Sequence, residues 1–188
     1  MDMPAPTLDA ATVARLAARH PLLIGDLRSN HAGETGAVMI YRGILTCSRD
    51  AAVRDFAARH LKTEAGHLRL LDGLLEPSQR SRLLPIWRVA GWLTGALPAL
   101  AGPAAVQVTI EAVETFVDHH YQEQIDRLPE TGEAGAVRAL LERCRLEEVE
   151  HRDEAAELLG AGRGWLARLW GGIVGRGSAA AVAAARRI

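Results

Sequence analysis

Two helical segments of this sequence place a glutamate and a histidine, three residues apart, within stripes of apolar side chains. In "LKTEAGHLRLL", residues 61–71, the pair is Glu64 and His67, and in "LLERCRLEEVEHRDEAAELL", residues 140–159, it is Glu148 and His151. Residues three and four apart share one face of a helix, so both pairs are expected to face the core. A buried carboxylate needs a compensating partner, which limits the folds open to this chain.

Each pair follows a helix that carries a single glutamate on its apolar side. Glu34 lies in "NHAGETGAVMIYRGIL" and Glu114 in "VTIEAVETFVDHHYQEQI". Glu64 follows Glu34 by 30 residues and Glu148 follows Glu114 by 34, enough for one helix, a turn and an antiparallel return to the same depth. The chain therefore reads as an internal duplication of a helix with Glu followed by a helix with Glu-x-x-His.

Four carboxylates meeting in the core of a helical bundle would repel one another and lose their hydration. Two divalent cations balance their four negative charges, and two neutral histidines add ligands without adding charge. A ligand set rich in oxygen disfavours structural zinc and favours iron or manganese, and we expect two iron ions. The predicted metal ligands are Glu34, Glu64, His67, Glu114, Glu148 and His151.

The fold class is predicted to be all-α, because helical periodicity is the one consistent pattern and alternating β-branched runs are absent. Breaks are expected at the turn-forming stretches 76–79, 101–103, 128–135 and 160–164. The alanine-rich end, residues 178–188, either packs closely on a neighbouring helix or frays. The expected helices span residues 8–19, 26–47, 49–75, 81–98, 103–128, 133–159 and 163–186.

Composition excludes some classes of partner. The 188 residues suffice for one domain with a real core, and the net charge of -1 provides no field that would attract nucleic acid. The two cysteines, Cys47 and Cys144, are expected to be buried thiols in a reducing compartment. The first 20 residues do not resemble a secretory signal or a transit peptide, which predicts a cytoplasmic location.

A hydrophobic segment, residues 83–110, carries a single charge at Arg88. Prolines at positions 85, 98 and 103 argue against a clean membrane-spanning helix. Either the segment lies in a membrane interface, with Trp87 and Trp92 as anchors, or it is an ordinary core helix. Composition leaves both interpretations open.

Other polar residues near the stripes have simpler roles in this interpretation. His31 is expected to make a local hydrogen bond at a helix start, and His120 lies off the face that carries Glu114. Tyr121 returns to that face, where it either packs in the core or donates a hydrogen bond near the metal. Glu147 is expected at the surface, with the orientation of a ligand histidine on an adjacent helix as the alternative.

With these residues in place, the sequence resembles the demethoxyubiquinone hydroxylase family of di-iron carboxylate monooxygenases, over residues 20–188. The matching pieces are "NHAGETGA", "EAGH", "VETFVDHHYQEQI" and "EEVEH", together with the tryptophan-bearing hydrophobic segment between the two halves. The six predicted ligands match the family's iron ligands one by one. The resemblance also implies that His120 and Tyr121 assist electron and proton delivery.

The resemblance implies a ferritin-like four-helix bundle with a di-iron centre and additional hydrophobic helices. Residues 1–19 would form an N-terminal extension with a short helix, and residues 20–188 one domain whose segment 83–110 contacts a membrane. The implied reaction is the hydroxylation of a polyprenyl methoxy-methyl-benzoquinol by dioxygen in ubiquinone biosynthesis, with NADH as a candidate reductant. The implied location is peripheral, on the cytoplasmic face of the inner membrane, and an accessory lipid-binding protein is a candidate partner.

Two other classes of function remain open on the residues alone. A soluble ferritin-like peroxidase, manganese catalase or iron-oxidising protein could use the same six ligands on peroxide or ferrous ion. A metal-stabilised helical bundle without enzymatic activity, acting at a membrane surface, is the other alternative. The hydrophobic segment and the small size of the chain speak against the soluble enzymes.

Overall fold

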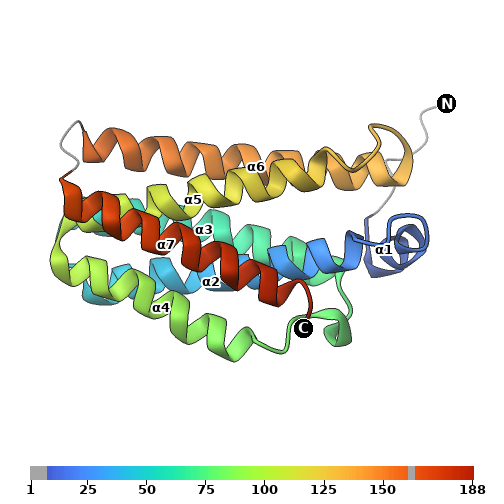
Figure 1. The fold of residues 1–188 in the computed structure, drawn as a ribbon, viewed down its shortest axis with the longest axis horizontal. Helices are drawn as coiled ribbons and strands as arrows, with labels where there is room; N and C mark the ends of the chain where they lie inside the picture. Colours follow the sequence, from blue (N-terminus) through green and yellow to red (C-terminus); the bar gives the residue numbers. More distant parts are fainter. Residues whose placement is uncertain (1–7, 161–163) are drawn as a thin grey trace.

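The computed structural model describes residues 8–160 and 164–188, and the described residues form α-helices joined by short turns, with no strand (Figure 1). The long helices α2 to α7 run along the long axis of the molecule, while α1 lies at one end of the bundle (Figure 1). In chain order the elements are α1 (Ala10–Ala17), α2 (Leu23–Cys47), α3 (Ala51–Leu74), the 3-10 turn η1 (Pro77–Gln79), α4 (Leu84–Ala101), α5 (Pro103–Ile125), α6 (Gly132–Leu159) and α7 (Trp165–Ala185).

These elements confirm the all-α prediction and the helices expected from the periodicity. Asp50 caps α3 by accepting a hydrogen bond from the Val53 amide, 2.9 Å away, which explains why the helix begins there. Helix α4 continues beyond Pro98, where we expected its end, and closes at Gly102, whose φ of 114° suits glycine. Residues 1–7 of the predicted extension and 161–163 of the last predicted break lie outside the described residues.

A four-helix bundle consists of two antiparallel hairpins, α2 with α3 and α5 with α6. Helices α4 and α7 are additional: α4 packs mainly on α2, and α7 packs on α5 and α2. Figure 1 shows α7 crossing the front of the bundle with α4 below it. This arrangement matches the ferritin-like bundle with additional hydrophobic helices that the sequence predicts. The division into residues 1–19 and 20–188 stays a prediction.

Two apolar clusters fill the two ends of the bundle. One joins Leu16, Leu27, Leu74 and Ile125 near α1, and the other joins residues such as Ile44, Phe56, Val106 and Ile110 at the far end. On all four bundle helices, the predicted ligand positions fall between these clusters in sequence. The polar residues thus lie at mid-depth, with apolar packing on either side.

Helices α2 and α4 are in backbone contact, which glycines make possible. A Cβ atom added at Gly95 would lie far inside van der Waals contact of the Ile40 carbonyl oxygen, and one at Gly91 would meet the Gly36 carbonyl oxygen in the same way. Small residues at such a crossing let two helices approach more closely than larger side chains allow. This contact fixes α4 against the bundle.

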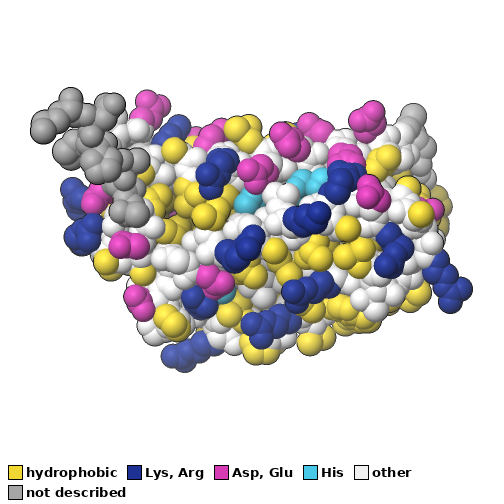
Figure 2. Space-filling view, turned by 180° about the vertical axis from the view of Figure 1, so that it is seen from behind, with side chains coloured by type: hydrophobic (Ala, Val, Ile, Leu, Met, Phe, Trp, Pro, Cys, Tyr) yellow, Lys and Arg dark blue, Asp and Glu magenta, His cyan; other side chains and the backbone are white. Residues whose placement is uncertain are grey.

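The hydrophobic segment 83–110 divides into two parts with different surroundings. Residues 106–110, at the start of α5, are buried in the bundle, so this part cannot be the membrane contact that we expected of the whole segment. Helix α4 instead exposes apolar side chains, namely Ile86, Val89, Leu93, Leu97 and Leu100. Figure 2 shows hydrophobic side chains, with Lys and Arg among them, along the lower edge of the molecule over α4. Among the described residues, no helix has both the length and the apolar character needed to cross a bilayer.

We predict that Gly95→Ala lowers the free energy of unfolding by about 1–3 kcal/mol, because the added methyl group forces α4 away from α2. Gly172→Ala on α7 is the matched control, since a Cβ there meets no atom within 4 Å. It should leave stability unchanged or raise it by about 0.5–1 kcal/mol. Urea unfolding measures both, and equal stability of the two variants would contradict the close α2–α4 contact.

Candidate metal centre

The structure brings the six predicted ligand side chains together at the centre of the bundle. One atom from each of Glu34, Glu64, His67 and Glu148 lies within 4.8 Å of the others, and the same holds for Glu64, Glu114, Glu148 and His151. The two groups share Glu64 and Glu148. Each of the four glutamates comes from a different helix of the bundle, so the site depends on the register of all four helices.

The oxygen and nitrogen atoms of this cluster are close together but poorly hydrogen-bonded. His67 Nδ1 lies 2.9 Å from Glu148 Oε1, and His151 Nδ1 lies 3.1 Å from Glu64 Oε1. Both nitrogens and both carboxylate oxygens of Glu64 and Glu148 are buried without an acceptable hydrogen bond. Buried polar atoms are normally satisfied, so this set is suited to another kind of partner.

The electrostatics show that the cluster lacks positive charge. Burial, followed by the neighbouring carboxylates, raises the pKa of Glu64 and of Glu114 well above the ordinary value. Burial lowers the pKa of His67, but its contacts with Cys144, Glu148 and Glu34 outweigh that effect and raise it overall. Without a cation, the cluster therefore takes up protons.

Two divalent cations would replace those protons. The donor set contains four carboxylates and two imidazoles, and each imidazole directs Nδ1 at the carboxylates. Such oxygen-rich sets suit iron and manganese. Cation binding releases the protons that the buried carboxyl groups and histidines would otherwise hold. The orphaned atoms and the raised pKa values of Glu64 and Glu114 both fit a pair of metal ions.

Two tyrosines connect the halves of the duplication. Tyr41 follows Glu34 by seven residues, yet its hydroxyl donates to Glu114 Oε1 at 3.4 Å. Tyr121 follows Glu114 by seven residues and donates to Glu34 Oε1 at 2.6 Å. Each half thus holds the carboxylate of the other half. The sequence pattern put Tyr121 near the metal, but not opposite Glu34.

His120 lies next to Tyr121 but does not contact the six side chains. Its Nε2 is 3.0 Å from Ser29 Oγ and 2.8 Å from Gln124 Nε2, and Gln124 in turn bonds Asn30. Burial, followed by the charges of Arg186 and Arg127, lowers the pKa of His120 to about 4, so it is neutral at pH 7. His120 therefore belongs to a buried polar network beside the candidate metal centre.

The structure corrects two expectations and adds a residue to the centre. His31 reaches across to α3, where its Nε2 lies 3.0 Å from Asp72 Oδ1, so the expected bond at its own helix start is wrong. Cys47 is only half-buried, whereas Cys144 is buried as expected. Glu147 is half-exposed and lies 2.6 Å from His67 Nε2, the geometry of the alternative that orients a histidine. The sequence feature that indicates this contact is the position of Glu147 directly before the predicted ligand Glu148.

A cavity of about 350 Å³ reaches the carboxylates from the side covered by α4 and α7. Its walls are mostly apolar or small, and they come from α2, α4, α5 and α7, for example Ile40, Trp87, Val117, Trp170 and Ala181. Glu34, Glu64, Glu114 and Glu148 also line it. An apolar molecule in this cavity would therefore lie against the predicted metal ligands.

A second access lies on the opposite side, between α3 and α6. There an open groove reaches His67 and His151 and is lined by charged side chains, including Lys62, Arg143 and Glu150. Figure 2 shows histidine atoms at this surface between acidic and basic side chains. The centre thus has an apolar approach and a polar one.

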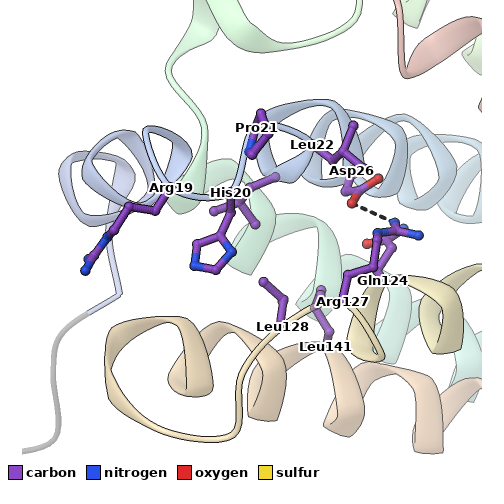
Figure 3. Close-up of a pocket in the computed structure, with 10 residues that line it drawn as sticks. Arg19, His20, Pro21, Leu22, Asp26, Gln124, Arg127, Leu128 and Leu141 are labelled. Carbon is purple, nitrogen blue, oxygen red and sulfur yellow. Dashed lines mark hydrogen bonds and ion pairs between the residues drawn. The ribbon is translucent and has the colours of Figure 1, made fainter.

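A smaller hollow, of about 200 Å³, lies at the end of the bundle near α1 (Figure 3). Arg127 crosses it to bind Asp26 at 2.8 Å, and Arg186 binds the other carboxylate oxygen at 2.8 Å. These ion pairs join α2 to the end of α5 and to the residue after α7. We interpret the hollow as part of this structural junction.

The chain is similar in sequence to known proteins. The chain matches the family model described as "Ubiquinone biosynthesis protein COQ7" over residues 23–185. It is 39% identical over 130 residues to the 3-demethoxyubiquinol 3-hydroxylase of Rhodospirillum rubrum, and 35% identical over 133 residues to that of Cupriavidus metallidurans. It is 34% identical over 136 residues to a rat mitochondrial protein named NADPH-dependent 3-demethoxyubiquinone 3-hydroxylase.

These alignments cover 68%, 70% and 70% of this chain. They cover 60%, 63% and 62% of the relatives, so the chain spans about three fifths of the length of the proteins that it matches. The matched region includes the six predicted ligands, Tyr41 and Tyr121, all of which lie within residues 23–185.

We predict that His120 makes folding stability depend on pH. Its folded-state pKa of about 4 lies below that of an unfolded histidine, about 6.5. The unfolded chain therefore binds a proton between these values that the folded chain does not, and stability is lost as the pH falls from about 6.5 to 4, by about 1.4 kcal/mol per pH unit.

Between pH 7 and pH 5, His120→Gln should lose less free energy of unfolding than the parent, by about 1.4 kcal/mol for each pH unit below about 6.5. Urea unfolding at the two pH values measures the difference. The exposed neighbour provides the control, His119→Gln, which should retain the slope of the parent. Equal slopes for the His120→Gln variant and the parent would mean that the buried network does not depress the pKa of His120.

Proposed function

This chain belongs to the family of the ubiquinone biosynthesis protein COQ7, and we propose that it hydroxylates a demethoxyubiquinol-like quinol with dioxygen. The names of its relatives support the proposal. The observation that carries it is the apolar cavity of about 350 Å³ that ends on four buried carboxylates. The overall change replaces a ring C–H by C–OH, while dioxygen, two electrons and two protons yield that hydroxyl group and one water.

The proposed cofactor is a pair of iron ions. Glu34, Glu64, Glu114 and Glu148 would hold or bridge the two ions, and His67 and His151 would each complete one of them. When bound, the iron pair supplies the activation of dioxygen, which organic side chains do not provide at useful rates. The protein contributes the position of the substrate and a site from which water is largely excluded.

The side chains around the cavity divide this work. The apolar walls desolvate the ring and hold it against the carboxylates, because burying apolar surface is the main source of binding free energy there. Tyr121 and Tyr41 fix the orientation of Glu34 and Glu114 through their hydroxyl groups. In keeping with the implied proton delivery, Tyr121 holds its proton on the oxygen, since burial raises its pKa well above the ordinary value.

The polyprenyl tail of the substrate implies a location at a membrane surface. Helices α4 and α7 line the cavity and also expose apolar side chains to solvent. On α7 these are Trp165, Leu166, Leu169 and Ile173. A helix of this kind can lie in the interfacial layer while the quinol ring enters the protein and the tail stays in lipid. We propose the cytoplasmic face of the inner membrane as the location, with an accessory lipid-binding protein as a candidate partner.

The two electrons require a reductant. The rat relative is named NADPH-dependent, and we propose a nicotinamide dinucleotide, NADH or NADPH, in this role.

Soluble peroxidases and catalases act on small polar substrates, for which a large apolar cavity gives no advantage. The same cavity argues against a bundle without enzymatic activity.

Expression of the parent chain in cells that lack late quinone hydroxylation should restore the hydroxylated product, measured by mass spectrometry of the extracted quinones. Glu148→Ala should restore none, because Glu148 belongs to both groups of ligand atoms. Iron content of the purified proteins should fall in parallel. Accumulation of the same precursor with the parent and with the variant would contradict the proposed activity.

A second test narrows the cavity without changing a ligand. Ala181 lines the cavity, so Ala181→Leu should raise the KM for the quinol about tenfold or more while iron content stays at the parent level. Ala183→Leu makes the same change on the exposed side of α7 and should behave like the parent. An unchanged KM in the Ala181→Leu variant would show that the substrate does not use this cavity.

A further inference from the structure

The two histidines of the centre are oriented by different means. His67 directs Nδ1 at Glu148 Oε1, 2.9 Å away, and its other nitrogen, Nε2, lies 2.6 Å from Glu147 Oε2. A carboxylate accepts and does not donate, so once Nδ1 binds a metal ion the one proton of the ring lies on Nε2, where Glu147 accepts its hydrogen bond. Glu147 therefore leaves the lone pair of Nδ1 directed into the cluster.

His151 has no such carboxylate on its outer nitrogen. Its Nδ1 lies 3.1 Å from both Glu64 and Glu148, and among the described residues these are the only carboxylates within ion-pair distance of the ring. The ring packs instead against His60, with 4.0 Å between the centroids and 69° between the planes. His60 Nε2 in turn lies 2.8 Å from Glu154 Oε2.

This difference has a chemical consequence for metal binding. A carboxylate that accepts the second N–H of a ligand histidine fixes its tautomer and ring orientation and makes the metal-bound nitrogen more basic. Loss of such a partner typically weakens metal binding about 10–100-fold. An aromatic neighbour restricts the ring but adds no negative charge.

We propose that the two metal positions of this centre are unequal and that Glu147 is the positioning residue responsible for tighter binding at the position served by His67. The inference rests on the proposed metal centre and goes beyond it by assigning a role to a residue outside the six ligands. The position served by His67 is built from Glu34, Glu64 and Glu148 besides the histidine. The other position uses Glu114 and is enclosed on the side of Tyr41 and His60.

The location of Glu147 makes the proposal testable by substitution. Glu147 is half-exposed on the wall of the open groove between α3 and α6, so replacing it leaves no buried cavity. Glu150 lines the same groove on the same helix and is exposed. It lies one turn away from Glu147 and therefore provides the matched control.

The experiment measures metal release and not turnover. The full chain is loaded with two equivalents of Fe²⁺ without oxygen and mixed with an excess of a coloured ferrous chelator. The parent should release iron in two phases of equal amplitude. Glu147→Leu should accelerate the slower phase about 10–100-fold and leave the other within twofold. Glu147→Gln should lie between the two, because its amide oxygen still accepts the hydrogen bond without the charge.

Glu150→Leu and Glu150→Gln should release iron like the parent. Thermal unfolding of the iron-loaded Glu150 variants should show the same stability as the iron-loaded parent. Release in a single phase from the parent, or phases that Glu147→Leu does not change, would overturn the inference. Equal acceleration of both phases would also overturn it. These outcomes differ from failure of the proposed function. If the chain binds no iron, the proposed metal centre itself is wrong. If the chain hydroxylates the quinol but Glu147→Leu does not change iron release, only the role of Glu147 is wrong.

Discussion

Four carboxylates and two imidazoles in the middle of a helical bundle are the constraint on which the rest of this structure depends. Charges of one sign in a water-poor core repel one another, and their cost falls only when positive charge is added or protons are taken up. The raised pKa values of Glu64 and Glu114 express the second route, and two divalent cations would provide the first. The apolar clusters at both ends of the bundle hold the helices in the register that brings the six side chains together.

The surroundings of the centre differ from one side to the other. On the side of α4 and α7 the cavity walls are mostly apolar, and these helices also expose apolar side chains. On the side of α3 and α6 the approach is polar and open. A substrate that remains in lipid and reactants that arrive from water would thus meet the centre from opposite directions, which fits the activity named for the relatives of this chain.

The convergence of the six side chains was predictable from the sequence because helical periodicity translates directly into position on a face. Glu34, Glu64, His67, Glu114, Glu148 and His151 converge as that pattern indicates. Contacts between helices were harder to predict, because their relative rotation is not encoded in one stripe. The bond from His31 to Asp72 and the exchange of tyrosine contacts between the two halves are of this kind. The hydrophobic pattern also did not predict the close approach of α2 and α4, although the paired glycines Gly91 and Gly95 are a sequence feature that indicates it.

The most direct test of the central claim is anomalous X-ray diffraction at the iron edge from crystals of the iron-loaded protein. We expect two peaks in the bundle core, one within bonding distance of His67 Nδ1 and the other within bonding distance of His151 Nδ1. Crystals without such peaks, in which the four carboxyl groups hydrogen-bond to one another as protonated acids, would contradict it.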